Sequence, residues 1–260
     1  MYIVTATSDN YAKPLGVMLN SLLENLENKD NVNIFIIESN ISNNNKLKLE
    51  KIGERFNIQV KFIAIDDNLF NSFKRKFKRI TKEAYYRIMI PELLSNHITK
   101  ALYLDCDMIV RKDISKLWNI NIDNYFLAAV EDLGILKKSI KRLSLPQGSS
   151  YFNSGLLLIN LQKWRENNIS TKVIQFIKNN HEIIKFMDQD PLNSILYDKW
   201  LKLEYEWNYT TGHQKKIKID DSAIIHFTGN KKPWNSEHPY KQEYLKYLSS
   251  SAWEEGNNQS

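Results

Sequence analysis

Residues 102–110, LYLDCDMIV, place two carboxylates inside an apolar run, with Asp105 and Asp107 on either side of Cys106. Carboxylates are rarely buried unless they are paired, hydrogen-bonded or bound to a metal. Successive residues of a strand point to opposite faces, so the two acids can share one ion only if the strand ends there and the chain turns. The other reading of the motif, a surface strand that simply ends in two acids, stays open at this point.

A third candidate ligand, His226, ends another apolar run in AIIHFTGNKKPW, residues 223–234. Mn²⁺ and Mg²⁺ favour oxygen ligands, and Mn²⁺ also accepts an imidazole nitrogen. A lone histidine in such a place is usually a satisfied core residue. Here a turn with Gly229, Lys231 and Lys232 follows it and offers backbone N–H groups and cations suited to a phosphate. Together these features predict a metal–diphosphate complex.

Two further stretches carry more polar residues than a scaffold requires. YFNSGLLLIN, residues 151–160, places Asn153 directly before an apolar run. MDQDPLN, residues 187–193, gathers Asp188, Gln189 and Asp190 at the start of a predicted helix. N-capping of that helix accounts for one of the two acids. It does not account for all three polar residues.

Strands alternate with helices through about residue 110, which predicts an α/β domain with a mainly parallel sheet. The predicted strands are 2–6, 33–38, 58–65, 101–107, 125–130, 155–160, 201–207 and 223–227. The predicted helices are one that begins near Pro14, 42–56, 82–94 with Pro91 ending or kinking its regular part, 161–167, 171–180 and roughly 189–198. Ligands of such sheets bind outside the carboxyl ends of the strands. Residues 8–11 and 105–107 fall at such ends and mark the expected site.

Composition is that of a globular protein, with 260 residues, 42% hydrophobic and 25% charged. We expect one continuous domain over residues 1–240. A short C-terminal extension covers 241–260. The single cysteine excludes an internal disulfide and fits a reducing compartment. The sequence has no signal-peptide pattern and no apolar run of membrane-spanning length, so we expect a cytoplasmic protein.

The formal net charge of +6 suits anionic partners such as nucleotide phosphates or acidic lipid surfaces. The densest basic run, residues 74–79, is expected to be a solvated helix face or loop. No repeated aromatic–basic pattern predicts nucleic-acid binding. The tail, residues 238–250, either touches an anionic membrane surface, in particular the inner face of the cell membrane, or packs as a terminal helix on its own domain.

The motifs, taken in order, resemble glycosyltransferase family 8, the retaining enzymes that include bacterial lipooligosaccharide galactosyltransferases. The matching stretches are TATSDNYA (5–12), YYRI (85–88), LYLDCDMIV, AAVEDLG (128–134), YFNSGLLLIN, MDQDPLN and HFTGNKKPW. The resemblance implies a GT-A fold, with a Rossmann-like, mainly parallel central sheet flanked by helices. It also implies a UDP-linked sugar donor and Mn²⁺, with Mg²⁺ as the alternative ion. On this resemblance, residues 1–240 are the catalytic domain, with a nucleotide-binding half over about 1–110 and an acceptor-side half over about 111–240.

The resemblance also assigns roles to individual residues. Asp105, Asp107 and His226 resemble the family's metal ligands. The nucleotide-side contacts are Ala6, Ser8, Asn10, Tyr11 (stacked on the base) and Cys106, and the diphosphate contacts are Gly229 and Lys232. The sugar-side, catalytic positions are Arg87, Asn153, Asp188, Gln189 and Asp132. Ser8 departs from the acid that many members carry, and neighbouring Asp9 is the candidate to compensate.

The expected reaction transfers a hexose, galactose or glucose, from the UDP-sugar to a hydroxyl of a saccharide, glycolipid or glycoprotein in bacterial cell-surface glycan or glycoprotein synthesis. Because Gln189 is an amide and a poor nucleophile, front-face substitution is favoured over double displacement through Asp188. The rival classes are a metal-dependent nucleotidyltransferase and a non-catalytic nucleotide-sugar-binding protein. Release of pyrophosphate would indicate the former, and metal-dependent donor binding without turnover the latter.

Overall fold

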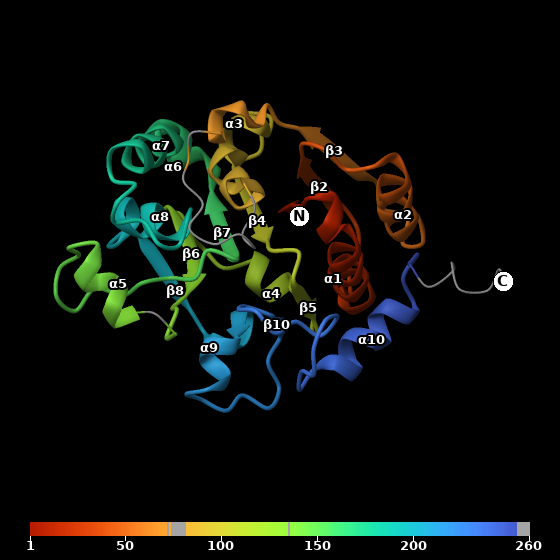
Figure 1. Ribbon diagram of the computed structural model, residues 1–260. Coiled ribbons are helices and arrows are strands. Elements are labelled where there is room, and N and C mark those ends of the chain that lie inside the picture. Colours follow the sequence, from red (N-terminus) through yellow and green to blue (C-terminus); the bar gives the residue numbers. More distant parts are fainter. Residues whose placement is uncertain (72, 74–81, 135, 254–260) are drawn as a thin grey trace.

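The computed structural model describes residues 1–71, 73, 82–134 and 136–253, and its strands form two sheets (Figure 1). The larger sheet has the spatial order β3 (Val60–Ala64), β2 (Asn33–Glu38), β1 (Tyr2–Ala6), β4 (Lys100–Leu104), β7 (Leu156–Asn160), β6 (Leu127–Val130) and β8 (Trp200–Leu203). Its pairs are parallel except that β7 runs antiparallel to both neighbours, β4 and β6. The predicted α/β class and mainly parallel sheet are confirmed.

The smaller sheet brings the stretch that contains His226, residues 223–234, beside the stretch that contains Asp105 and Asp107, residues 102–110. It consists of β5 (Met108–Val110), β10 (Ile224–His226) and β9 (Tyr209–Thr210). β10 pairs antiparallel with β5, and its register places His226 opposite Met108. The backbone N–H of Phe227 also donates to the carbonyl of Asp107 at 2.9 Å. Sheet pairing therefore fixes His226 next to the two acids, although the sequence separates them widely.

Helices cover both faces of the larger sheet (Figure 1). The α-helices are α1 (Ala12–Asn25), α2 (Asn43–Glu54), α3 (Ile90–Leu93), α4 (Ser115–Trp118), α5 (Leu136–Arg142), α6 (Leu161–Glu166), α7 (Ile169–Asn179), α8 (Gln189–Leu196), α9 (Thr211–Gln214) and α10 (Lys241–Ser249). The 3₁₀ helices are η1 (Asp9–Tyr11), η2 (Asp67–Phe70), η3 (Lys82–Met89) and η4 (Tyr205–Asn208).

Side chains of the central strands divide between two apolar clusters, one on each face. On β1, Ile3 packs into the cluster with α1 and α2, while Val4 packs into the cluster with η3 and α6–α8. On β4, Leu102 belongs to the first cluster and Tyr103 to the second. This alternation is the two-residue period of a strand. It explains why both central strands read as nearly continuous apolar runs.

Three elements differ from the sequence prediction. The strand predicted over 101–107 ends at Leu104, because the chain bends there so that β5 can enter the other sheet. The helix predicted over 82–94 is a 3₁₀ helix followed by the short α3, and Pro91 lies in the first turn of α3, where its missing N–H costs no bond. The strand predicted over 201–207 ends at Leu203, because the N–H of Trp207 bonds the carbonyl of Glu204 instead of a neighbouring strand.

The tail of the described chain forms α10, which lies against α1 (blue and red in Figure 1). Tyr244 and Tyr247 of α10 are buried in a cluster with Val17. Within the described residues, no helix is long and apolar enough to cross a membrane. The basic run at 74–79 lies outside the described residues.

Candidate active site

A cavity of about 440 Å³ opens at the edge of the larger sheet where β1, β4 and β6 end. Of the residues that the family resemblance assigns to the site, all but Asn10 line it, and Asn10 is exposed on η1. Asp9, Asp190 and Lys231, which the sequence also singled out, do not line it. The lining members are Ala6, Ser8, Tyr11, Arg87, Asp105, Cys106, Asp107, Asp132, Asn153, Asp188, Gln189, His226, Gly229 and Lys232.

The reversed direction of β7 explains how Asn153 reaches this edge. Residues that follow the parallel strands β1, β4 and β6 meet there because their carboxyl ends coincide. β7 runs the other way, so the residues that precede it, Asn153 to Gly155, lie at the same edge. The backbone N–H of Asp105 donates to the carbonyl of Gly155 at 2.8 Å, which joins the two motifs directly.

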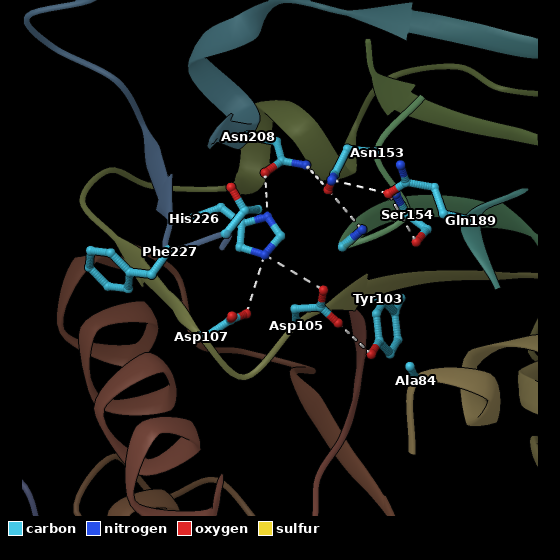
Figure 2. A network of polar contacts seen from close by, with 12 residues as sticks. Ala84, Tyr103, Asp105, Asp107, Asn153, Ser154, Gln189, Asn208, His226 and Phe227 are labelled. Atoms are coloured by element: carbon cyan, nitrogen blue, oxygen red, sulfur yellow. Dashed lines mark hydrogen bonds and ion pairs between the residues drawn. The ribbon is translucent and has the colours of Figure 1, made fainter. Parts of the chain in front are cut away.

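Asp105, Asp107 and His226 converge on one point. One ligand atom from each lies within 4.8 Å of the others. The Nε2 atom of His226 is 3.2 Å from Oδ1 of Asp107 and 3.6 Å from Oδ2 of Asp105 (Figure 2). Two carboxylates and an imidazole form a donor set that suits Mn²⁺, and the oxygens also suit Mg²⁺.

Gly155 supports the fit of a cation among these three side chains. A Cβ atom built on it would lie 2.3 Å from Cε1 of His226 and 2.6 Å from Oδ2 of Asp105. Even a methyl group at this position would therefore fill the space between the ligands. The residues that are present fit a divalent cation, and the site depends on the absence of a side chain at residue 155.

Arg87 connects the acids to the far side of the cavity. Its side chain is 4% exposed and forms ion pairs with Asp105 at 2.9 Å and with Asp188 at 3.1 Å. It also donates to the carbonyl of Ser154. Burial works to lower the pKa of Arg87, but the two carboxylates outweigh it and the pKa is raised. Arg87 is therefore a permanent cation at the centre of the site.

Asp188 is a buried carboxyl whose pKa is raised by its surroundings. Burial raises its pKa from 3.8 to about 6, although the charge of Arg87 acts in the opposite direction. The ion pair is weakly aligned, because the Nε–H of Arg87 donates to the carbonyl of Ala84 and leaves Oδ2 of Asp188 without a hydrogen bond. This oxygen is buried next to Arg87 and accepts no hydrogen bond from the described residues.

Gln189, Asn153 and Asp132 form a hydrogen-bonded cluster, called here the amide cluster. The Nδ2 atom of Asn153 donates to Oε1 of Gln189 at 3.1 Å and to Oδ2 of Asp132 at 3.3 Å. The Nε2 atom of Gln189 donates to the same Asp132 oxygen at 3.2 Å. The backbone N–H of Ser154 donates to Oε1 of Gln189 at 3.0 Å. Gln189 is thus held in one orientation by partners on both sides.

Lys232 places a cation beside the second acid. Its Nζ lies 2.5 Å from Oδ2 of Asp107. Burial works to raise the pKa of Asp107, but Lys232 and His226 hold it well below its usual range. Burial also works to lower the pKa of Lys232, and the attraction of Asp107 raises it. The pair stays ionised across the physiological range.

The nucleotide-side residues lie on η1 and on the turn after β10. The ring of Tyr11 meets that of Trp234 edge to face, with centroids 6.1 Å apart. Asp9 does not line the cavity. Its Oδ1 accepts from the N–H of Ser42 and from Nδ2 of Asn45, both at 2.8 Å, and so ties η1 to the start of α2. The expectation that Asp9 compensates for Ser8 is not supported by this placement.

The expected capping of α8 is wrong. Asp188 occupies the N-cap position but accepts no capping hydrogen bond. Asp190 lies inside the first turn, and its Oδ2 accepts from the N–H groups of Lys185 at 2.6 Å and Phe186 at 2.8 Å, in the loop before the helix. It also pairs with Arg142 at 2.7 Å and shows no exposure. Asp190 therefore holds the preceding loop, which leaves Asp188 and Gln189 directed into the cavity.

Sequence reasoning missed several polar residues at the site, among them Asn208 and Glu83. Asn208 is fully buried and lies between His226 and Asn153 (Figure 2). Glu83 lines the cavity, and its Oε2 has no hydrogen-bond partner within the described part of the chain. Neither residue stands in a motif: Asn208 directly follows the strand predicted over 201–207, and Glu83 falls in the helix predicted over 82–94. Only their position in three dimensions identifies them.

Comparison with solved structures defines the class of fold. A crystal structure of the galactosyltransferase LgtC, in complex with donor and acceptor sugar analogs, superposes with a TM-score of 0.86 over 96% of each chain at 24% identity. The chain has the GT-A fold of glycosyltransferases. The expected fold is therefore confirmed.

Sequence comparison identifies the family. The model of Glycosyl transferase family 8 matches residues 2–238, and the chain belongs to this family of glycosyltransferases. General stress protein A of Bacillus subtilis strain 168 is 40% identical over 273 residues, which cover 97% of this chain and 94% of that protein. Lipopolysaccharide 1,2-glucosyltransferase of Escherichia coli K12 is 28% identical over 262 residues, 95% of this chain and 77% of that protein.

Proposed function

We propose that this glycosyltransferase is a retaining enzyme that moves a hexose from a UDP-sugar to a hydroxyl of a saccharide acceptor. One observation carries the proposal: the carboxylate–imidazole triad and the amide cluster face a single cavity. The triad suits the diphosphate end of a donor, and the amide cluster, with Asp188, suits the hydroxyls of a sugar. A donor that joins a diphosphate to a sugar spans both.

The nucleotide is assigned to the η1 side of the cavity. Tyr11 offers a ring face to the base, with Trp234 holding that ring from its edge. Ala6, Ser8 and Asn10 contact the nucleoside, and Cys106 lies between the two acids, against the ribose. Burial raises the pKa of the Cys106 thiol well above its usual range, so we assign it a packing role.

The metal ligands in the proposal are Asp105, Asp107 and His226, with Mn²⁺ as the ion and Mg²⁺ as the alternative. When bound, the cation acts as a Lewis acid on the leaving diphosphate. Lys232 adds positive charge at the same end of the cavity. Gly229 has a φ of 90°, a backbone conformation that is strained for most residues other than glycine. These groups stabilise negative charge as the leaving oxygens develop it.

The sugar is assigned to Arg87, Asn153, Asp132, Asp188 and Gln189. We propose front-face substitution, in which the leaving phosphate takes the proton of the acceptor hydroxyl. Double displacement requires a free carboxylate as nucleophile. Gln189 is an amide whose oxygen already accepts from Ser154 and Asn153, and Asp188 is paired with Arg87. Recovery of a glycosylated Asp188 peptide by mass spectrometry would overturn this route.

The acceptor is proposed from the relatives as a saccharide, a glycolipid or a glycoprotein in bacterial cell-surface glycan synthesis. One relative is named as a lipopolysaccharide glucosyltransferase and another, from Salmonella typhimurium, as a lipopolysaccharide 1,3-galactosyltransferase. Galactose and glucose are therefore both candidate donor sugars. We propose that the enzyme acts in the cytoplasm, with peripheral contact at the inner face of the membrane.

We propose that residues 1–240 work as one catalytic domain, with donor-binding groups mostly from about 1–110 and acceptor-side groups mostly from about 111–240. From the second half, His226, Gly229 and Lys232 serve the diphosphate of the donor, and Asp132, Asn153, Asp188 and Gln189 serve its sugar. The remainder, 241–260, is treated as an extension, of which α10 packs on α1.

A donor screen tests the proposal. Purified protein with Mn²⁺ is incubated with UDP-galactose, UDP-glucose or their N-acetyl analogues, and UDP and free sugar are measured by mass spectrometry. We expect slow hydrolysis of one donor that EDTA and Asp107→Asn both abolish. Release of sugar 1-phosphate, with UMP or a uridylylated product, would instead indicate nucleotidyl transfer. Metal-dependent donor binding without any product, even with saccharide acceptors added, would indicate a binding protein.

A further inference from the structure

Asn208 bridges the metal triad and the amide cluster. Its Oδ1 is 2.9 Å from Nδ1 of His226, and its Nδ2 donates to Oδ1 of Asn153 at 2.9 Å (Figure 2). Its side chain shows no exposure, and those of His226 and Asn153 are 3% and 6% exposed. Water therefore has little access to these hydrogen bonds, and each partner depends on the other.

Two backbone N–H groups determine which side-chain atoms donate and which accept in the row of hydrogen bonds from Gln189 through Asn153 and Asn208 to His226. The N–H of Gly155 donates to Oδ1 of Asn153 at 3.0 Å, which fixes that atom as the oxygen of the amide. The N–H of Ser154 fixes Oε1 of Gln189 in the same way. The group of Asn208 that faces Asn153 must then be its NH₂, because a second oxygen there would find no hydrogen. Its own oxygen consequently faces His226.

An amide oxygen beside Nδ1 requires that Nδ1 carry the hydrogen. A neutral imidazole protonated at Nδ1 has its lone pair on Nε2. That atom is the one that points at Asp107 and Asp105. The hydrogen-bond chain that starts at the backbone of residues 154 and 155 thus determines which nitrogen of His226 can bind a cation.

We propose that Asn208 is a positioning residue that holds His226 in the Nδ1–H tautomer with Nε2 directed at the cation, and that joins this ligand to the amide cluster. The inference rests on the proposed function for its catalytic meaning, since it assigns His226 to a metal. The tautomer itself follows from hydrogen bonds between residues of this chain. A residue that orients a metal-binding histidine typically contributes a factor of about 10–100 in metal affinity.

The first test is the tautomer of His226, measured on the EDTA-treated protein without substrate. Protein labelled with ¹⁵N-histidine is recorded by long-range ¹H–¹⁵N correlation at a pH where the imidazoles are neutral, and His226→Asn identifies the signal. We expect Nδ1–H for His226 in the wild type. Free neutral histidine prefers Nε2–H, so a wild-type His226 whose Nδ1 carries no hydrogen would overturn the proposal without any variant of Asn208.

The second test separates the two hydrogen bonds of Asn208. Asn208→Leu removes both, so we expect His226 to lose the Nδ1–H preference and the Kd for Mn²⁺, measured by electron paramagnetic resonance of free Mn²⁺, to rise about 10–100-fold. Asn208→Asp keeps an acceptor for Nδ1–H but has no hydrogen to donate to Asn153. It should retain the tautomer and bind Mn²⁺ at least as tightly as the wild type. Its kcat should fall, because the amide cluster loses the hydrogen bond from residue 208 to Asn153.

Asn193→Leu is the matched control. Asn193 is equally buried and donates to the carbonyls of Phe152 and Gln189 at 2.9 Å, without contact to His226. This substitution should lower the melting temperature but leave the tautomer and the Mn²⁺ affinity unchanged. If Asn208→Leu behaves like this control, Asn208 is only structural. If Asn208→Leu does not fold, weakened Mn²⁺ binding or an Nε2–H signal in Asn208→Asp would overturn the proposal.

The outcomes distinguish this inference from the proposed function. An inactive protein in the donor screen that still shows the Nδ1–H tautomer, and Mn²⁺ affinity dependent on Asn208, would remove the enzymatic assignment and keep the positioning role. An active, Mn²⁺-dependent enzyme whose neutral His226 carries its hydrogen on Nε2 would keep the enzymatic assignment and remove the positioning role of Asn208.

Discussion

At the scale of single residues, the absence of a side chain at Gly155 matters as much as the presence of the acids. Ser154 and Asn153 precede it and contribute side chains to the cavity, whereas Gly155 lets the ligands His226 and Asp105 approach its Cα. The glycine is required by the close approach of other groups and not by its backbone angles, since its φ is not positive.

Gly155→Ala is expected to weaken cation binding. The added methyl lies 2.3 Å from Cε1 of His226, so the ring or the backbone must shift. Overpacking of this kind costs about 1–3 kcal/mol of folding free energy. We expect at least a tenfold rise in the Kd for Mn²⁺ by titration, with the EDTA-treated variant still folded by circular dichroism. Wild-type Mn²⁺ affinity in a folded variant would contradict the assignment of the site.

Asp188 is expected to make stability depend on pH. Its pKa is about 6 in the folded protein against an ordinary 3.8, so the folded state holds the proton more tightly. The resulting stabilisation is present in full below pH 3.8 and is lost as the pH rises through 6. The difference corresponds to roughly 3 kcal/mol as an upper value.

Urea unfolding of the EDTA-treated wild type and of Asp188→Asn checks this sign. The free energy of unfolding of the wild type, relative to the variant, should fall by up to roughly 3 kcal/mol between pH 4 and pH 7.5. Titrating groups far from Asp188 contribute equally to both proteins and cancel. A difference that stays constant, or grows with pH, would show that Arg87 outweighs burial at this carboxyl.

At the scale of elements, α10 is held to α1 by buried aromatic side chains with unequal polar contacts. The hydroxyl of Tyr247 accepts from Nδ2 of Asn25 at 2.9 Å. The hydroxyl of Tyr244 is buried and has no hydrogen-bond partner within the described residues. Asn20, in α1, also donates to the backbone carbonyl of Tyr247 at 3.0 Å. The two tyrosines therefore provide a matched pair of substitutions.

Tyr247→Phe should destabilise the protein by about 1 kcal/mol, because it removes a hydrogen bond and leaves Asn25 with one partner fewer. Tyr244→Phe should be neutral or slightly stabilising, since it removes a buried hydroxyl that lacks a partner. Chemical denaturation of both variants measures the difference. Equal destabilisation by the two substitutions would mean that the Tyr244 hydroxyl is satisfied in solution, for instance by water.

At the scale of the whole molecule, residues that serve one ligand come from distant parts of the chain. Ligand binding should therefore stabilise the fold as a unit. A ligand at 100 times its Kd contributes about 2.7 kcal/mol, which for a domain of this size raises the melting temperature by roughly 5–10 °C. We expect this shift with UDP and Mn²⁺ together, and a much smaller one with UDP plus EDTA. Calorimetry that shows an equal shift with EDTA would argue against a metal in donor binding.

The sequence alone predicted all seven strands of the larger sheet and β10, and it singled out residues that the fold brings to one cavity. Periodicity revealed β1, β2 and β10, because buried strands are short runs of apolar residues, and the polar interruptions at 105–107 and 187–190 stood out against such runs. It misjudged residues 201–207 and 82–94, because in both places local 3₁₀ hydrogen bonds replaced the predicted pattern. The composition of a segment does not determine whether its backbone N–H groups bond to carbonyls of the same turn or to carbonyls of a distant segment.

What the sequence by itself determined is the inventory of this site: two acids beside Cys106, a histidine before a basic turn, and Asn153, Asp188 and Gln189 next to apolar runs. Only the tertiary structure decided how they work together. In the fold, β7 runs antiparallel to β4 and β6, so that the residues before β7 lie at the same edge of the sheet as the residues after β4 and β6. The fold also places Asn208 between His226 and Asn153. The reason is physical: hydrogen-bond direction and close packing depend on which groups meet across the fold, and that information lies in no single stretch of the chain.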